Sequence, residues 1–367
     1  MKRTLGLTLL LFATLFSCMR QEKPLPAELS RAESVMWEHP DSALSILRSM
    51  PQSSLSIGKN YATWALLLAQ ARDKVYGKRL PDSLNIPSSD KLVQDAMDYF
   101  EKEGDLKRMA QTYYYKGQLL KDQKKITEAM PFFLKSKEMM TKLDEPLFTY
   151  LICQSLGNMY RYQDLYEESL VQLKDAYQYA LRSGNGERIS YALSELGRTY
   201  VHKNEMDSAL FYFGKSLDNA QRLGNIELEA MAMGELGVVY NKLSQGEKAL
   251  HYTRKELDLC LQISSLHKLP QVYYKIGSAF WSLGQLDSAK VYFQKSLETD
   301  NLYTLNEAYE VLYYICVEQK LYKEAIEYNN QYLIYSDSLQ VINHAGELAE
   351  IQARYDHERL LNINNQL

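Results

Sequence analysis

The chain has 367 residues, of which 46% are hydrophobic, and a formal net charge of −4 at pH 7, so it has ample apolar content for a large core. The near-neutral charge balance argues against non-specific nucleic-acid binding, and we expect no nucleic-acid partner. Four cysteines in a chain of this length argue against a disulfide framework.

Residues 1–18 are predicted to be a targeting segment rather than part of the fold. Lys2 and Arg3 precede a short apolar run that ends at Phe16, and this run is too short to span a bilayer as a mature helix. The segment closes with Leu-Phe-Ser-Cys at Cys18. This ending resembles a bacterial lipobox, which implies that Cys18 is acylated and becomes the new N-terminus. The alternative is a plain secretory signal with an incidental cysteine.

The lipobox resemblance implies a protein that is lipid-anchored to a membrane surface of the cell envelope, on the periplasmic or extracellular side. More than one acyl chain is expected, because a single chain binds a membrane only marginally. Residues 19–26 are predicted to be a short tether that contains two prolines. The sequence after this tether has no stretch that is apolar enough to span a membrane.

Residues 27–104 are predicted to form degenerate helical repeats. A helix pair is expected over residues 27–50, with Asp41 opening the second helix because aspartate is a common N-cap. A long apolar helix is predicted over 59–76 and an amphipathic helix over 91–100. A proline-containing loop separates these two helices in the prediction.

Residues 105–305 are predicted to contain five copies of a repeat that is marked by a glycine. The glycines recur every 40 residues, at Gly117, Gly157, Gly197, Gly237 and Gly277. A small residue follows each one twelve positions later, at Ala129, Ser169, Ala209, Ala249 and Ala289. A glycine in mid-helix costs about 1 kcal/mol relative to alanine. Five of them therefore predict the close approach of a second helix, with the small residue at +12 as the point of contact.

Each copy is predicted to be a pair of antiparallel helices. With the glycine at position zero, offsets −4, −1 and +3 are mostly apolar and share one helix face. A second helix is expected to begin near +10, where Asp207-Ser208 and Asp287-Ser288 resemble N-caps, and to bury offset +16. Turns are expected near +27, at Asp144, Gly184, Gly224, Ser264 and Thr304.

Residues 306–339 are predicted to form a sixth, degenerate copy of the repeat. In this copy Leu312, Cys316 and Ala325 take offsets −1, +3 and +12. The last stretch, 340–367, is polar, and its sparse apolar residues have coiled-coil spacing over about two heptads. This pattern predicts either a capping helix that covers the end of the stack or a helix that pairs with a partner.

The repeat as a whole resembles the tetratricopeptide repeat. The resemblance rests on Leu-Gly-x-x-Tyr followed by Ala at +12 and Phe at +16, and it is sharpest at Leu196-Gly197, Tyr200, Ala209 and Phe213. It implies an all-α fold, a right-handed superhelical solenoid of antiparallel helix pairs with an extended C-terminal helix. The usual unit has about 34 residues, so a period of 40 requires longer helices or turns. HEAT-type repeats are the alternative, but they lack the small residues at zero and +12.

The titratable and nucleophilic residues show no catalytic pattern. None of the six histidines pairs with a cysteine or carboxylate at metal-ligand spacing. The sequence contains no phosphate-binding glycine loop and no nucleophile elbow. Cys153 and Cys316 fall on core offsets and are expected to be buried thiols. We therefore expect no enzyme activity, no metal and no cofactor.

The resemblance also implies where a ligand binds. In the tetratricopeptide family the first helices line a concave wall that binds extended peptides or partner helices, and offsets −3, +1, +4 and +5 belong to that wall. The residues predicted to bind a peptide are Lys121, Asn158, Arg161, Tyr162, Arg198, His202, Asn241 and Trp281. Four firm cations and one acid at offsets +1, +4 and +5 favour a peptide that carries carboxylates. The alternative is a solvated helix face.

These observations predict a non-catalytic, lipid-anchored scaffold that binds a protein or peptide outside the cytoplasm. The alternative is the sensor portion of a signal-transducing regulator, either truncated or acting with a partner. The chain is similar to Bacteroidetes-type tetratricopeptide lipoproteins and to the extracytoplasmic parts of larger regulators. In those regulators a coiled helix leads from the repeats to a membrane span, and residues 340–367 resemble the start of such a helix.

Overall fold

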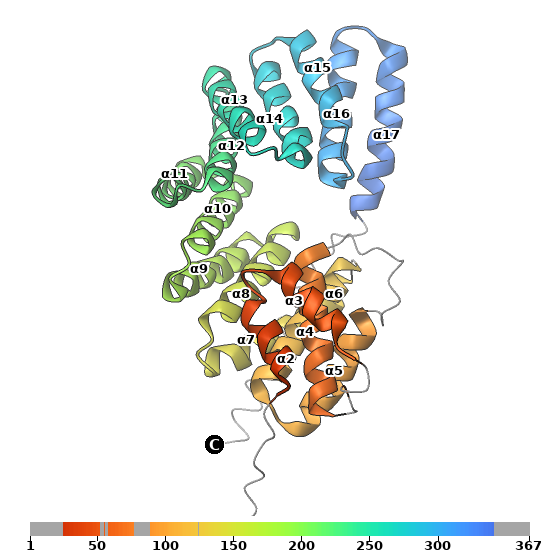
Figure 1. Ribbon diagram of the computed structural model, residues 1–367. Coiled ribbons are helices and arrows are strands. Elements are labelled where there is room, and N and C mark those ends of the chain that lie inside the picture. The colour runs from red at the N-terminus through yellow and green to blue at the C-terminus, as the bar shows by residue number, and fades with distance from the viewer. Residues whose placement is uncertain (1–24, 52–54, 56–57, 77–88, 124, 341–367) are drawn as a thin grey trace, which may run out of the picture. The chain divides into compact units, whose positions relative to one another are not determined.

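The computed structural model describes residues 25–51, 55, 58–76, 89–123 and 125–340. Every element of regular secondary structure in these residues is a helix, and successive helices form antiparallel pairs (Figure 1). This confirms the all-α, repeat-built fold class. The chain divides into two compact units, residues 1–104 and 105–367, and each is described by itself.

The described residues of the first unit form two pairs of helices. Their bounds are α2 Ala27–Val35, α3 Pro40–Ser49, α4 Lys59–Tyr76 and α5 Ser89–Glu103. Trp64 of α4 is buried, and its indole nitrogen donates to the carbonyl of Leu47 at 2.9 Å, which fixes α3 against α4. The capping role predicted for Asp41 is wrong, because α3 already begins at Pro40 and His39 is the N-cap residue. Asp41 lies in the first turn, where its charge interacts favourably with the helix dipole.

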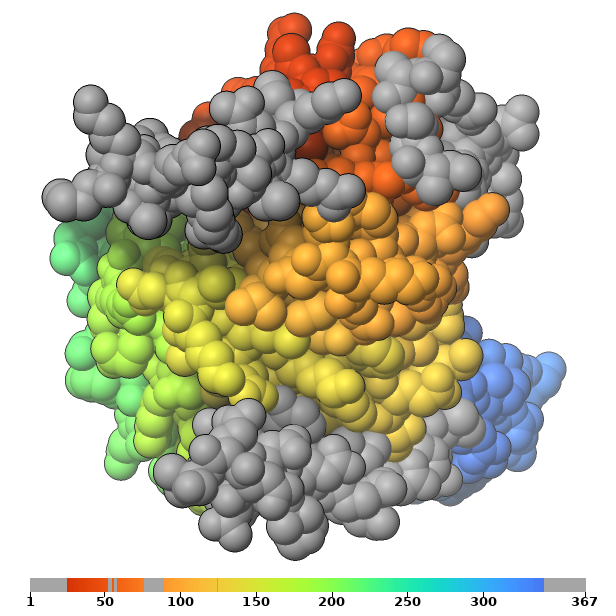
Figure 2. Space-filling model, turned by 90° about the horizontal axis from the view of Figure 1, so that it is seen from below, coloured from red at the N-terminus to blue at the C-terminus, as the bar shows by residue number. Residues whose placement is uncertain are grey.

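In the second unit, the described residues form a run of six helix pairs. The bounds are α6 Leu106–Asp122, α7 Ile126–Lys142, α8 Pro146–Tyr162, α9 Tyr166–Ser183, α10 Gly186–His202, α11 Met206–Leu223, α12 Ile226–Lys242, α13 Gly246–Gln262, α14 Leu269–Ser282, α15 Leu286–Ser296, α16 Leu302–Glu318 and α17 Tyr322–Gln340, with a short 3₁₀ turn, η2 Leu266–Lys268, before α14. In the space-filling view the yellow residues of α7 and α8 form one closely packed surface (Figure 2).

The 40-residue period is accommodated mainly by long helices. In the second and third copies, first helices of 17 residues and second helices of 18 residues are joined by two or three residues. The turns predicted at +27 are confirmed for Asp144, Gly184, Gly224 and Ser264, which all have positive φ. A second left-handed residue, at +7 in these copies, reverses the chain inside each pair, and glycine or a small polar residue fits there. These residues are Asp164, Asn204, Ser244 and Gly284.

Helix capping differs from the prediction. Asp207 and Asp287 do not cap α11 and α15, because each lies one residue inside its helix. The side-chain caps are on the first helices instead. Four residues accept a hydrogen bond from the backbone N–H three positions later: Asp105, Asn185, Asn225 and Asn301. Asn301 caps α16, so Thr304 lies inside that helix rather than in a turn.

The repeat glycines do allow close helix approach, but the contacting residue differs from the prediction. A Cβ added at Gly197 would lie 2.6 Å from the ring of Phe213, and one added at Gly157 would lie 2.6 Å from Leu173. These partners occupy offset +16, whereas the small residue at +12 is buried beside them and contributes its backbone, as the Ser169 carbonyl does at 3.3 Å. A helical side chain covers the turn N-terminal to its own Cα, so the +16 side chain covers the surface near +12.

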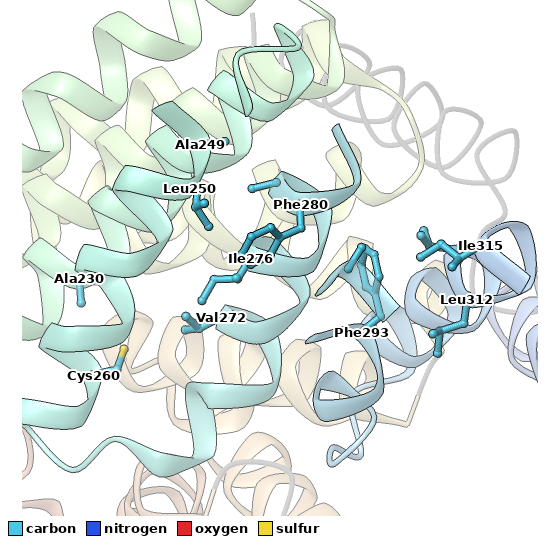
Figure 3. Close-up of a cluster of buried hydrophobic side chains, with 13 residues drawn as sticks. Ala230, Ala249, Leu250, Cys260, Val272, Ile276, Phe280, Phe293, Leu312 and Ile315 are labelled. Carbon is cyan, nitrogen blue, oxygen red and sulfur yellow. The ribbon is translucent and has the colours of Figure 1, made fainter. Parts of the chain in front are cut away.

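The core of the second unit is a series of buried clusters, and neighbouring clusters share the partly buried rings of Tyr177, Tyr200 and Tyr240. Figure 3 shows the cluster at the C-terminal end, where Val272 and Ile276 of α14 lie toward Leu250 of α13 and Phe293 of α15 lies toward Leu312 of α16. A single pair could not bury these side chains, so the stack supplies the core.

The sixth copy keeps the roles predicted for it. Leu312, Cys316 and Ala325 are all buried. The 36-residue step between Ala289 and Ala325 reflects α15, which has only 11 residues. The predictions for residues 1–18 and 341–367, the acylated cysteine and the C-terminal helix included, lie outside the described residues.

Candidate functional site

The first helices of successive pairs form one wall of the second unit. α8 contacts α10, α10 contacts α12, α12 contacts α14 and α14 contacts α16, in addition to each helix's contact with its own partner. The array bends so far that the ring of Tyr162, at the end of α8, stacks on Tyr303, at the start of α16, with centroids 5.7 Å apart. We call the exposed face of α8, α10, α12, α14 and α16 that carries offsets −3, +1, +4 and +5 the inner wall.

A ladder of ion pairs lies directly under the inner wall. Arg161 of α8 is 5% exposed, and its Nη1 is 2.5 Å from Oε2 of Glu195 on α10. Arg198 pairs with the other oxygen of Glu195 at 2.7 Å and with Oε1 of Glu235 on α12 at 2.6 Å. The alternation of charge joins three consecutive repeats, and each buried charge has a partner of the opposite sign, as burial requires.

A second buried pair continues this pattern in the next repeat. Lys275 of α14 lies 2.7 Å from Oε1 of Glu256 on α13. Glu256 occupies offset +19, which is small in the other copies, and the room for it comes from Gly234, where an added Cβ would be 2.3 Å from the carboxylate. The pattern of apolar and small offsets did not identify Glu256 as a buried charge or Gly234 as the glycine that makes room for it. Glu256 and Gly234 both depart from the pattern of the other copies, and their occurrence in one copy was the sequence signal that could have identified this buried pair.

Glu195 makes the stability of the ladder depend on pH. Burial alone would raise the pKa of Glu195, but Arg198 and Arg161 outweigh it and hold this pKa below the ordinary value of 4.5. The resulting stabilisation is fully present above 4.5, the unfolded-state value, and is lost as the pH falls through the lower folded-state pKa. We therefore expect the difference in unfolding free energy between the wild type and Glu195→Gln to shrink steadily as the pH is lowered below 4.5, in denaturant titrations at a series of pH values. A difference that is constant with pH would contradict this assignment.

The residues predicted to bind a peptide occupy two settings. Tyr162 and Trp281 are exposed by 48% and 38%, and His202 is also reached by solvent. Arg161 is buried and Arg198 is 32% exposed, and both are engaged by glutamates. Whether any of them contacts a ligand stays a prediction.

The remaining predicted residues are amides, one lysine and the histidine. Asn158 and Asn241 are half-buried, and their Oδ1 atoms have no hydrogen-bond partner among the described residues. Lys121 lies at the end of α6 and donates to Gln118 one turn earlier. His202 stacks on Tyr166, and desolvation, Arg161 and Lys242 lower its pKa, so its imidazole is neutral at pH 7.

The positive bias predicted for the inner wall depended on four cations, and two of them are paired with glutamates. The glutamates at offset −2, Glu195 and Glu235, were not counted, yet they neutralise Arg161 and Arg198. With Lys275 and Glu256, the ladder has three cations and three carboxylates. The chemical nature of the wall surface is therefore determined by aromatic rings and amide side chains as much as by charged groups.

Other chemistry is sparse in the described residues. No group of three or more His, Cys, Asp or Glu side chains is placed to hold a metal ion in this part of the chain. Cys153, Cys260 and Cys316 are buried free thiols, and burial raises the pKa of each. Within the same residues, no helix combines the length and apolar content needed to cross a bilayer.

Comparisons with known proteins agree with this architecture. The family model described as tetratricopeptide repeat matches residues 110–139 and 270–301. A search of curated proteins gives no match.

Solved structures with the same fold cover most of the chain. A signal transduction ATPase of the STAND type with a tetratricopeptide repeat sensor, from Pyrococcus horikoshii, is 16% identical with a TM-score of 0.60, over 84% of this chain and 46% of that chain, so this chain spans about half its length. A Rap protein complexed with competence and sporulation factor is 12% identical with a TM-score of 0.61, over 86% and 98% of the two chains. Aspartyl phosphate phosphatase F from Bacillus subtilis is 14% identical with a TM-score of 0.51, over 92% and 96%.

At these identities the solved structures show the fold alone. The evidence for the repeats is the two segments that match the family model and the 40-residue periodicity of the glycines. The helix pairs, their left-handed turns and the buried glycine contacts recur through the second unit. The second unit is therefore an α-solenoid of tetratricopeptide-like helix pairs, two segments of which match the tetratricopeptide repeat, and its first helices form a continuous wall.

Proposed function

We propose that this chain is a non-catalytic scaffold that binds a protein or peptide ligand on the inner wall. The observation that carries the proposal is a set of exposed aromatic side chains on that wall, Tyr162, Trp281 and Tyr303. Rings that present an apolar face and a polar edge are typical of binding surfaces rather than of solvated helix faces. The solved Rap protein complexed with competence and sporulation factor, which shares the fold, is consistent with a ligand-binding role.

Polar groups beside the rings suit an extended main chain. Asn158 and Asn241 have Oδ1 atoms that are buried and lack partners among the described residues, so a ligand N–H group can reach them only after the amide side chains rotate. Arg198, the more exposed of the two ladder arginines, can offer its solvent-facing edge to a ligand acceptor while it stays paired with Glu235. Such contacts fix the path of a peptide along the wall, and the aromatic rings pack on its side chains.

Substitution of inner-wall aromatics is expected to weaken ligand binding. Trp281→Ala should reduce the affinity for a captured peptide by about tenfold or more, because an exposed aromatic anchor contributes on the order of 2 kcal/mol. The matched control is Phe211→Ala on α11, which removes a ring that is 54% exposed but lies on a second helix. The measurement is titration calorimetry with peptides captured from a synthetic random pool. Equal losses for both variants, or a loss only for Phe211→Ala, would refute the proposed surface.

We further propose that the scaffold is held on a membrane surface outside the cytoplasm through acylation of Cys18. The support is the short apolar leader and the lipobox-like Leu-Phe-Ser-Cys sequence. In a bacterial host, the wild-type chain is expected in the membrane fraction with a mass increase on an N-terminal cysteine. Cys18→Ser should move it to the soluble fraction. An unmodified wild-type chain that is cleaved elsewhere, and released, would contradict the anchor.

A second candidate function is the sensor portion of a signal-transducing regulator. The observation that favours it is the shared fold with a STAND signal transduction ATPase whose repeats are described as a sensor. In this case ligand binding must alter the end of the stack. Hydrogen exchange should then show ligand-dependent protection of α16 and α17, whereas a simple scaffold should change only where the ligand lies.

A further inference from the structure

One side-chain contact joins the two ends of the inner wall, although they lie four repeats apart. Tyr162 is the last residue of α8, and Tyr303 is the second residue of α16. Their aromatic rings stack with centroids 5.7 Å apart and planes inclined by 24°. Figure 1 shows α8 and α16 at the two ends of an arc that passes through α10, α12 and α14. The stack closes this arc, and we call the closed arrangement of the five helices the helix ring.

Both tyrosines lie on helix ends whose positions are fixed by other contacts. The Arg161 guanidinium lies 5.3 Å from the centre of the Tyr162 ring, and Glu195 holds this arginine in the ladder. Tyr303 lies in the first turn of α16, where the Asn301 side chain accepts a backbone N–H at 3.0 Å and caps the helix. The two tyrosines therefore move with their helices, so the stack depends on the separation of α8 and α16.

Charged groups inside the helix ring give a second observation of its closure. Desolvation, Arg161 and Lys242 lower the pKa of His202, at the end of α10. Burial raises the pKa of Glu307 on α16, and Tyr274 and Lys242 oppose this shift. Lys242 is the last residue of α12, and it lies close enough to act on both α10 and α16. The ends of these helices therefore converge on one space inside the helix ring.

The closing contact differs in kind from the contacts between neighbouring repeats. Neighbouring first helices are joined by buried groups, such as Arg161 with Glu195. Tyr162 and Tyr303, in contrast, remain 48% and 38% exposed while they stack. A contact that buries so little surface stabilises the closed arrangement much less than the packed core stabilises each repeat. The helix ring can therefore open at this contact while the repeats stay folded.

We propose that Tyr162 and Tyr303 form a clasp that holds the helix ring closed and opens it when the two aromatic rings separate. In the closed state a ligand cannot pass between α8 and α16 at this point. A ligand that packs on either tyrosine competes with the stack and shifts the equilibrium toward the open state. The clasp is a property of the free chain, so it goes beyond the proposed function and its test needs no ligand.

The test measures the separation of α8 and α16 in the ligand-free, full-length chain by pulsed electron paramagnetic resonance. Spin labels are attached at Glu168→Cys, in the first turn of α9, and at Glu298→Cys, between α15 and α16. Both positions are exposed and lie outside the clasp. Cys18→Ser removes one competing thiol, and the other three cysteines are buried.

We expect one predominant short separation in the labelled chain that keeps both tyrosines. Tyr162→Ala and Tyr303→Ala should each broaden the distribution and shift it to longer distances. The double variant should shift it no further than either single variant, because both changes remove the same contact. Tyr162→Phe keeps a ring that can stack, so it should preserve the short separation.

Tyr314→Ala is the matched control for loss of an exposed aromatic ring. Tyr314 is 50% exposed, lies on the same helix as Tyr303 and has its ring contact with Tyr313. This variant should leave the distribution unchanged, and every variant should keep the circular dichroism of the wild type. An unchanged distribution in both alanine variants, additive shifts in the double variant, or an equal shift in Tyr314→Ala would overturn the clasp. None of these results bears on the proposed function, which ligand binding tests separately.

Discussion

Replacing Glu195 by glutamine is expected to lower the free energy of unfolding by about 3–5 kcal/mol, the range found when one member of a buried ion pair is removed. The reason is the position of Glu195 between two arginines. Arg161 is 5% exposed and would keep its charge while losing its ion-pair partner among the described residues, and Arg198 would lose one of its two partners. We expect the loss to appear in chemical denaturation followed by circular dichroism, and in faster hydrogen exchange of α8 and α10.

An exposed pair of the same chemistry provides the control. Glu138 and Lys142 are one turn apart on α7 and 3.0 Å from each other, and the lysine side chain is 74% exposed. Glu138→Gln should change stability by less than about 1 kcal/mol, because exposed pairs contribute little. A double-mutant cycle of Glu195→Gln with Arg161→Met should show strong coupling, since the second change removes the stranded charge. If Glu195→Gln costs no more than the control, the ladder does not hold the repeats together.

Substitution of a repeat glycine is the second large expected effect. Gly197→Ala should destabilise the chain by about 1–3 kcal/mol through overpacking, although alanine alone would favour the helix by about 1 kcal/mol. The added Cβ would lie 2.6 Å from a ring carbon of Phe213, which is fully buried and has no room to move.

Gly214 is the matched control for this effect. It lies inside α11 of the same repeat, and a Cβ added there meets nothing within 4 Å. Gly214→Ala should therefore stabilise the chain by up to about 1 kcal/mol. Both variants add a Cβ atom, in adjacent helices of one repeat. Shifts of the unfolding midpoint in opposite directions would therefore isolate the effect of the contact with Phe213. Changes of the same sign would show that the glycine at Gly197 is not required for helix packing.

The architecture was predictable from the sequence because its determinants are local and repeat many times. Each determinant depends on a few neighbouring positions: the 40-residue glycine period, the apolar offsets and the turn residues at +27. Their recurrence in five copies distinguishes the pattern from chance. The detail of the interlock was not predictable in the same way. The sequence marks the small residue at +12, but the side chain that meets the glycine is at +16, because helical side chains lean toward the N-terminus.

The site was predictable only in part, because its charges are set by contacts between repeats. Arg161 and Arg198 fall on wall offsets in the sequence, yet their partners Glu195 and Glu235 come from other turns or the next repeat. The stacking of Tyr162 on Tyr303 depends on curvature accumulated over four repeats, which no local pattern records. The copy-specific pair of Gly234 with Glu256 did leave a trace in the sequence, as two exceptions in one repeat.

The central claim, that the first helices form a ligand-binding wall, is tested most directly by mapping where a captured peptide lies. A peptide retained from the random pool and carrying a photo-crosslinker should attach to residues of α8, α10, α12, α14 or α16, identified by mass spectrometry of the digested full-length chain. The account predicts crosslinks near Tyr162 and Trp281, and their loss on competition with unlabelled peptide. Specific crosslinks confined to the second helices α9, α11, α13 and α15 would contradict it.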